Sequence, residues 1–281
     1  MNFKDLISVP AVEPEAADYY GENGLLYCGV CHEPKEAFFP AGQNFFGKDR
    51  HPAECACQRK RREADEAERE EYHRRLRIRD LRERCFVNPI MRNWTFSNAT
   101  IRSKRVEQAM RYVAKWEKVR EANCGLLFWG SVGTGKSFLA GCIANALLEK
   151  EVTVCMTNLA AVINHDFAGK QEYIRKLCSY QLLILDDFGM ERDTSFALET
   201  VYDVIDGRYL SGKPLIVTTN LTLDELKKPQ DVDHQRIYDR VLAMTVPIRF
   251  TGDSLRSGQR STKREIVKDI FEGGEADTDG K

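Results

Sequence analysis

A glycine-rich octapeptide, GSVGTGKS, lies near the middle of this 281-residue sequence. It fits G-x-x-x-x-G-K-[ST] at every position, over Gly130, Ser131, Val132, Gly133, Thr134, Gly135, Lys136 and Ser137. The glycines let the backbone curl until its N–H groups point at phosphate oxygens, while the lysine neutralises the β- and γ-phosphates and the serine can ligate Mg²⁺. An apolar strand pattern precedes the loop and the helical pattern SFLAGCIANALLEK follows it. We therefore predict an ATP–Mg²⁺ site, and we include Phe138 at the start of the helix.

Two carboxylates follow the apolar run Leu182–Leu185, about fifty residues further along. Ligands of open α/β sheets bind outside the carboxyl ends of the strands, where Asp186 and Asp187 would lie. We predict that Asp186 holds Mg²⁺, through water, and that Asp187 polarises the attacking water as a general base. The alternative is that two acids merely cap a strand at a turn.

A later apolar run, KPLIVTTN, ends in Thr218, Thr219 and Asn220. An asparagine at the end of this strand could orient the attacking water next to the γ-phosphate. We predict that role for Asn220. The alternative is a strand that ends in polar turn residues.

Four of the nine cysteines form two close pairs, Cys28-x2-Cys31 and Cys55-x-Cys57. Paired thiolates on tight turns can close a tetrahedral shell around Zn²⁺ with no open catalytic position. The residues between the pairs are polar and rich in turn formers, so a metal would supply the stability that core burial cannot. We predict a zinc module, with His32 and His51 as less favoured ligands and unmetallated cysteines as the alternative. The other five cysteines show no such pairing and are interpreted as small core residues.

Composition limits the class of protein. Hydrophobic residues make up 42% and charged residues 30%, and the net charge is −1. These values exclude a strongly basic coat for nucleic acid, so any such contact must be local. The sequence has no apolar run long enough to span a membrane and no signal-peptide pattern at its N-terminus, so we predict no membrane partner and a cytoplasmic location.

The pattern along the chain predicts an α/β protein with a small N-terminal module. Short unalternating apolar runs, typical of parallel strands buried on both faces, alternate with helical stretches. The expected segments are an N-terminal tether or adaptor (1–27), a zinc module (28–57), a charged linker helix or flexible linker (58–87), an ATPase domain (88–256) and a partly disordered tail (257–281).

These motifs, in this order and spacing, resemble those of AAA+ ATPases. The similarity is greatest to the subgroup that contains the helicase loaders DnaC and DnaI and the transposition ATPase IstB. Three further elements support it. DDFGME begins with the two carboxylates, and NWTFSNATI lies upstream of the ATPase core. QRIYDRV resembles a motif that carries an arginine finger. The resemblance covers residues 86–256.

The resemblance implies a parallel five-stranded sheet with helices on both faces and a truncated lid. It also implies that Arg240, or second Arg236, acts in trans on the ATP of a neighbouring subunit, so that the protein self-assembles through its ATP sites. The alternative is a pair of helix-surface arginines. Asp187 stands where most AAA+ enzymes have glutamate, which favours a slow, switch-like ATPase.

By this resemblance, the protein is expected to load a DnaB-type hexameric replicative helicase onto single-stranded DNA. The zinc module would grip the helicase, although it could instead contact DNA. Basic and aromatic side chains between the run VTVCMT and the strand that carries the two carboxylates would bind the single-stranded DNA, namely Phe167, Lys170, Tyr173, Arg175 and Lys176. An amphipathic helix packed on the sheet is the alternative for that stretch. Two other functions remain open, an IstB-like ATPase that regulates transposition and an adaptor that binds ATP without hydrolysing it.

Overall fold

The structure is a computed structural model that describes residues 12–40, 47–99, 103–190, 194–229, 231–252, 254, 267–268 and 270–271. The chain divides into two compact units, Met1–Leu76 and Arg77–Lys281, and helix α1 (Ala56–Cys85) runs through the boundary between them. Within the described residues, no helix combines the length and apolar character needed to cross a bilayer. Most of residues 257–281, expected to hold the tail, lie outside the described part of the chain.

The first unit contains two antiparallel hairpins. Strand β1 (Tyr19–Tyr20) pairs with β2 (Leu26–Tyr27), and β3 (Glu36–Phe38) pairs with β4 (Arg50–Pro52). The first hairpin lies within residues 1–27, so part of the predicted tether or adaptor segment has a defined structure. The buried Lys35 connects this segment to the cysteine-bearing part, because its Nζ donates to Asp18 at 2.6 Å and to Glu15 at 3.3 Å.

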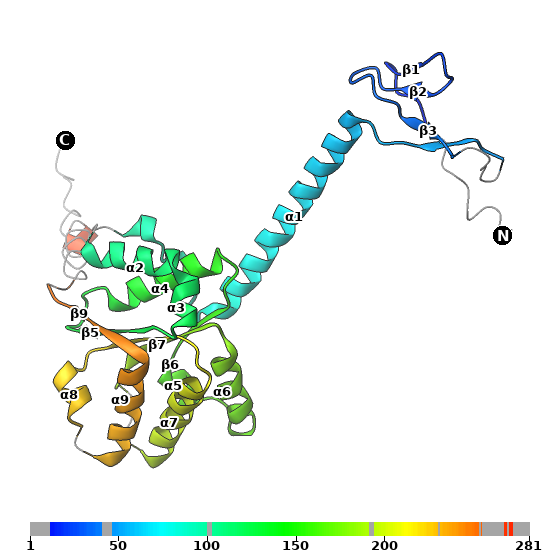
Figure 1. Cartoon of the computed structure of the whole chain (residues 1–281). Coiled ribbons are helices and arrows are strands. Elements are labelled where there is room, and N and C mark those ends of the chain that lie inside the picture. Colours follow the sequence, from blue (N-terminus) through cyan, green and yellow to red (C-terminus); the bar gives the residue numbers. More distant parts are fainter. Residues whose placement is uncertain are drawn as a thin grey trace, which may run out of the picture. The chain divides into compact units, whose positions relative to one another are not determined.

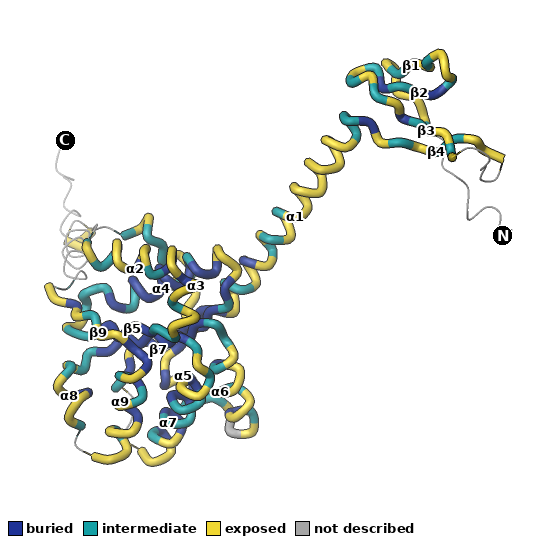
Figure 2. Tube along the Cα trace, viewed as in Figure 1, coloured by how far each residue is buried: buried dark blue, intermediate teal, exposed yellow. Residues whose placement is uncertain are grey.

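Helix α1 forms from a sequence that is almost entirely charged. Oppositely charged side chains four residues apart support it, such as Arg62 with Glu66 at 3.0 Å and Glu71 with Arg75 at 3.1 Å. Most of its length is exposed (Figure 2), and its buried residues are Ile78 and Cys85 near the C-terminal end. The sequence predicts either a linker helix or a flexible linker for residues 58–87, and the structure has a helix there.

The second unit is built on a five-stranded parallel sheet, as predicted. The strand order is β6-β7-β8-β5-β9. Four strands coincide with the predicted apolar runs, and the fifth, at one edge beside β5, was not recognised in the sequence. The bounds are β5 (Gly125–Gly130), β6 (Val154–Asn158), β7 (Leu182–Phe188), β8 (Leu215–Thr219) and β9 (Thr245–Phe250).

Helices cover both faces of this sheet (Figure 1). One face packs against α2 (Lys104–Ala114), α3 (Trp116–Glu121) and α4 (Lys136–Leu148), and the short 3₁₀ helices η2 (Pro89–Asn93) and η3 (Phe96–Asn98) precede them in the chain. The other face packs against α5 (Leu159–Ile163), α6 (Lys170–Ser179), α7 (Ser195–Leu210), α8 (Leu223–Lys227) and α9 (Val232–Met244), with η4 (Phe167–Gly169) between α5 and α6. Two apolar cores result, one on each face, so the strands read as continuous apolar runs.

A buried arginine holds two loops at the end of the sheet that is remote from the ATP-site motifs. The Arg208 guanidinium, 0% exposed on α7, donates to the carbonyls of Cys178, Tyr180, Gln181 and Pro214. Burial lowers its pKa to about 10, so the side chain stays charged at neutral pH.

We expect Arg208→Met to lower the free energy of unfolding by about 3 kcal/mol or more, because four carbonyls at buried or part-buried positions would lose a charged donor. Arg79→Met, at an exposed position on α1, is the matched control and should change stability by less than about 0.5 kcal/mol. Urea denaturation of both variants measures the difference. Equal midpoints for the two variants would contradict this role for Arg208.

Candidate nucleotide-binding site

The phosphate-binding loop connects β5 to α4 as the sequence predicts. Gly130 has φ 128°, and a Cβ there would lie 2.1 Å from the carbonyl oxygen of Phe250 on the neighbouring strand. Gly135 has φ 90° and caps α4 in the left-handed region, where a side chain would be strained. The first turn of α4 therefore directs backbone N–H groups and the positive end of the helix dipole at the loop, which suits a phosphate.

Lys136 and Asn220 meet at the end of the sheet. The Lys136 side chain is buried, and its Nζ donates to the carbonyls of Gly130 and Ser131, each at 2.7 Å, and to Asn220 Oδ1 at 2.9 Å. The loop lysine and the residue expected to orient water are thus in direct contact although they are 84 positions apart.

Asp186 is a buried carboxylate beside the loop. Its Oδ1 accepts a hydrogen bond from Thr218 Oγ1 at 2.6 Å, and the Ser137 hydroxyl also hydrogen-bonds it. Burial raises the pKa of Asp186, and the two hydroxyls oppose that shift. A divalent cation would favour the charged form of this carboxylate, so Asp186 and Ser137 form a donor pair that fits Mg²⁺.

Asp187 points away from the core. It is exposed, has φ 55°, and sits at an irregularity in the pairing of β7 with β8 between Leu185 and Phe188. Its backbone N–H donates to Thr218 Oγ1 at 3.0 Å. One threonine hydroxyl therefore positions both acidic residues. The sequence predicts no role for Thr218 beyond a polar strand end, and its position two residues before Asn220 is the signal that could have revealed one.

The upstream element NWTF packs against the helix that follows the loop. The indole of Trp94 would meet a Cβ on Gly141 at 2.5 Å, and its ring lies 5.8 Å from that of Phe138. Asn145 donates to the carbonyls of Met91 and Trp94, each at 2.9 Å. The signal that could have revealed this contact is a glycine and an asparagine inside an otherwise apolar helix.

The two candidate arginine fingers lie on α9 in different environments. Arg240 is paired with Asp206 of α7 at 2.9 Å, and its guanidinium lies 4.8 Å from the centre of the Tyr202 ring. Arg236 is exposed. Among the described contacts, neither arginine reaches the phosphate-binding loop of its own chain.

The predicted single-strand contact falls on α6, where the structure corrects one residue. Lys170 is 6% exposed, donates to the Ile163 carbonyl at 2.7 Å and lies 4.0 Å from the centre of the Phe196 ring, so it is a core residue. Tyr173 stacks on His165 with 4.2 Å between ring centres. Arg175 and Lys176 remain exposed, and the side chain of Phe167 lies outside the described residues.

Three of the four predicted zinc ligands converge in the first unit. The sulfurs of Cys28, Cys31 and Cys55 all lie within 4.8 Å of one another. Cys57 lies outside that group, but its thiol hydrogen-bonds with Cys31. Neither of the alternative ligands belongs to the group, since His32 contacts the Tyr19 hydroxyl and His51 contacts the Pro52 carbonyl.

The thiols of this module differ in acidity. Hydrogen bonds from the backbone of Glu33 and Cys57 lower the pKa of Cys31 to about 6, so a thiolate forms near neutral pH. Hydrogen bonding with Cys31 raises the pKa of Cys57 to about 11, and burial raises that of Cys55. A soft cation would favour the thiolate form of all four residues, and so the donor set fits Zn²⁺.

Comparison with known proteins agrees with this geometry. The profile of the IstB-like ATP binding protein family matches residues 61–263. The replicative helicase loader DnaC of Escherichia coli K12 is 23% identical over 67% of this chain and 79% of its own length. The uncharacterized protein YdaV of the same organism is 28% identical over 60% and 70%. The crystal structure of DnaI superposes with TM-score 0.52 at 22% identity, over 60% of this chain and 94% of that one, which supports the fold.

The family profile spans the loop, both acidic residues and Asn220, so the site and the similarity coincide. The chain belongs to the IstB-like ATP-binding protein family, with an AAA+ core of the DnaC/DnaI type.

Proposed function

We propose that this protein is an ATP-switched loader that places a DnaB-type hexameric helicase on single-stranded DNA. Family members with other roles have an ATPase core of the same kind, so the core alone does not decide the function. The observation that carries the proposal is the separate cysteine module ahead of that core. A docking module is what a loader requires to hold its helicase, and the similarity to DnaC supports this choice.

The charge of the module favours a protein partner over nucleic acid. Together with the first hairpin, to which Lys35 connects it, the cysteine module comprises residues 12–57, which contain eight acidic and three basic residues. Phosphate backbones repel such a surface, and the salt-dependent attraction that drives DNA binding would be lost. The module also exposes large apolar side chains, with Tyr20 at 65%, Val30 at 74% and Phe38 at 46%. Exposed aromatic and aliphatic anchors are typical of protein interfaces.

The nucleotide cycle would use the contacts around the loop. ATP would draw Lys136 from its carbonyl partners to the phosphates, and Asn220 would then be available to orient water. Ser137 and Asp186 would hold Mg²⁺, and Asp187 would act as the base. Aspartate reaches less far than glutamate, so we expect slow turnover suited to a switch. Arg175 and Lys176 on α6 would contact the DNA backbone.

Arg240 is the proposed finger, and it would exchange Asp206 for the phosphate of a neighbouring subunit. We expect Arg240→Ala to preserve ATP affinity and to lower hydrolysis by the ATP-assembled protein by about 10³-fold. Gln235→Ala, at an exposed position on the same helix, is the control, and Arg236→Ala tests the second candidate. Steady-state hydrolysis together with ATP titration separates the two effects, and unchanged turnover in Arg240→Ala would remove the finger assignment.

Native mass spectrometry with the replicative helicase of the same host, with and without ATP, tests the loader proposal. A complex with the helicase hexamer that contains zinc is the expected result. If the protein binds zinc and ATP but forms no complex with the helicase, either with ATP or without it, the loader proposal fails.

An IstB-like regulator of transposition is the second candidate, because the family profile that matches is named for that ATPase. Such a protein would stimulate a transposase on duplex DNA and would not bind the helicase. The same sample, titrated with duplex DNA and a transposase, distinguishes the two.

A further inference from the structure

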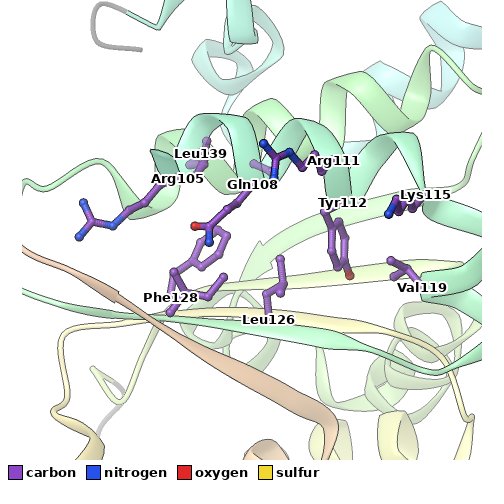
Figure 3. Close-up of a pocket in the computed structure, with 11 residues that line it drawn as sticks. Arg105, Gln108, Arg111, Tyr112, Lys115, Val119, Leu126, Phe128 and Leu139 are labelled. Carbon is purple, nitrogen blue, oxygen red and sulfur yellow. The ribbon is translucent and has the colours of Figure 1, made fainter. Parts of the chain in front are cut away.

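A cavity of about 270 Å³ lies between α2 and the sheet (Figure 3). Its floor is apolar, with Leu126 and Phe128 of β5, and the phenol ring of Tyr112 extends down from α2. Ile248 of β9, which pairs with Phe128 in the sheet, also lines the cavity. The described lining residues include three basic side chains and no acidic one. The basic residues are Arg105, Arg111 and Lys115.

The lining of this cavity favours an inserted side chain over a small molecule. Sites for drug-sized ligands commonly measure roughly 300–1,000 Å³ and bring several polar groups together. Here the Tyr112 hydroxyl is already used, since it donates to the Cys124 carbonyl at 2.9 Å. An apolar floor with a basic rim instead suits a peptide whose apolar face is flanked by acidic residues.

The chain leaves the sheet beside this cavity. Arg105, which lines the cavity, donates to the Arg249 carbonyl at 2.9 Å and to Thr251 Oγ1 at 3.3 Å. Its guanidinium also lies 5.0 Å from the centre of the Phe250 ring. The segment that follows β9 therefore starts where the cavity ends.

That segment carries an unburied apolar face. Val267, Ile270 and Phe271 are helical and are 50%, 69% and 82% exposed. Their i, i+3, i+4 spacing puts them on one side of a helix. The sequence after Phe271 is acidic, with Glu272, Glu275, Asp277 and Asp279 against a single lysine, Lys281.

We propose that residues 267–279 bind in the cavity of their own chain, with Phe271 and Ile270 inserted under α2 and the acidic residues facing Arg111 and Lys115. Fifteen residues separate Thr251 from Val267, and a linker of this length reaches up to about 50 Å, well beyond the roughly 16 Å length of α2. A tether of fifteen residues gives an effective concentration of about millimolar, which favours the same chain over a second copy. The docking does not depend on the proposed loading function.

Photocrosslinking of the full-length protein tests the proposal. Phe271→p-benzoylphenylalanine keeps an aromatic ring at the tip of the segment, and irradiation should link it to peptides from α2, β5 or β9. Tyr209→p-benzoylphenylalanine, at an exposed position on α7, is the control and should give no such link. An equal mixture with ¹⁵N-labelled protein reports whether the link joins one chain or two.

Charge reversal at the rim gives an independent readout. Arg111→Glu combined with Lys115→Glu should lower the yield of the link about fivefold, as expected for loss of two exposed ion pairs, and Lys118→Glu should leave it unchanged. Both sites are exposed, so folding should be preserved. Each of three results would overturn the proposal. They are the absence of links to the cavity peptides, links that join a light chain to a heavy chain, and a link yield that does not change when the rim charges are reversed.

Discussion

Replacing Lys136 by alanine is expected to weaken ATP binding by about 100-fold. A hydrogen bond to a charged group contributes about 1.5–3 kcal/mol, and the lysine is expected to reach two phosphates. Each 1.4 kcal/mol corresponds to about a factor of ten in affinity. Titration of the purified protein with a fluorescent ATP analogue in the presence of Mg²⁺ measures the change. Lys118→Ala, which removes an exposed lysine from α3, is the matched control and should bind normally.

Because Lys136 also donates to the carbonyls of Gly130 and Ser131, the stability of the alanine variant is measured alongside its ATP affinity. A melting temperature near that of the unaltered protein would show that the fold is intact, and Lys136→Arg, which keeps the charge but not the compact ammonium, should bind with intermediate affinity. If Lys136→Ala is folded and binds ATP as well as the control does, the nucleotide lies elsewhere.

Removing metal from the cysteine module is expected to unfold the β1–β4 hairpins while the ATPase unit stays folded. Structural zinc contributes about 10–16 kcal/mol to the folding of zinc-finger peptides at pH 7, more than the stability of most domains. Cys55→Ser should act like a chelator, because Cys55 is 0% exposed and its sulfur lies in the thiol group. Hydrogen exchange by mass spectrometry should show lost protection in residues 19–52 and unchanged protection in β5–β9.

Cys124→Ser is the matched control, since Cys124 lies outside the thiol group and is only half-buried. It should keep one metal ion per chain and full protection of both units. A protein that is purified without metal and nonetheless protects residues 19–52 would disprove the zinc assignment and leave four cysteines as reduced thiols.

The nucleotide loop and the cysteine site could both be predicted from the sequence, because each depends on a local pattern of residues. The loop is eight contiguous residues whose glycines determine its conformation locally, so its place between a strand and a helix could be predicted. The runs that became β5, β6, β7 and β8 were recognisable because strands covered on both faces must be apolar throughout. The spacing of the cysteines likewise predicted a shared site, and three of the four thiols meet as expected.

Only the tertiary structure decided the features that depend on contacts between distant residues. Strand β9, TVPIRF, has exposed residues and a proline, and it is a strand because β5 offers it a free edge. Lys170 has the sequence character of a surface lysine but is buried against Phe196. Asp206, which holds Arg240, could not be paired with it from a sequence separation of 34 residues.

The sequence by itself therefore determined the nucleotide loop, the kind of sheet and the existence of a cysteine site. The tertiary structure decided that Lys136 meets Asn220, that Thr218 positions both carboxylates and that a basic-rimmed cavity lies where the chain leaves the sheet. The physical reason is that backbone conformation and hydrophobic periodicity are local properties. Side-chain partners are instead selected by packing, which brings together residues that no spacing rule connects.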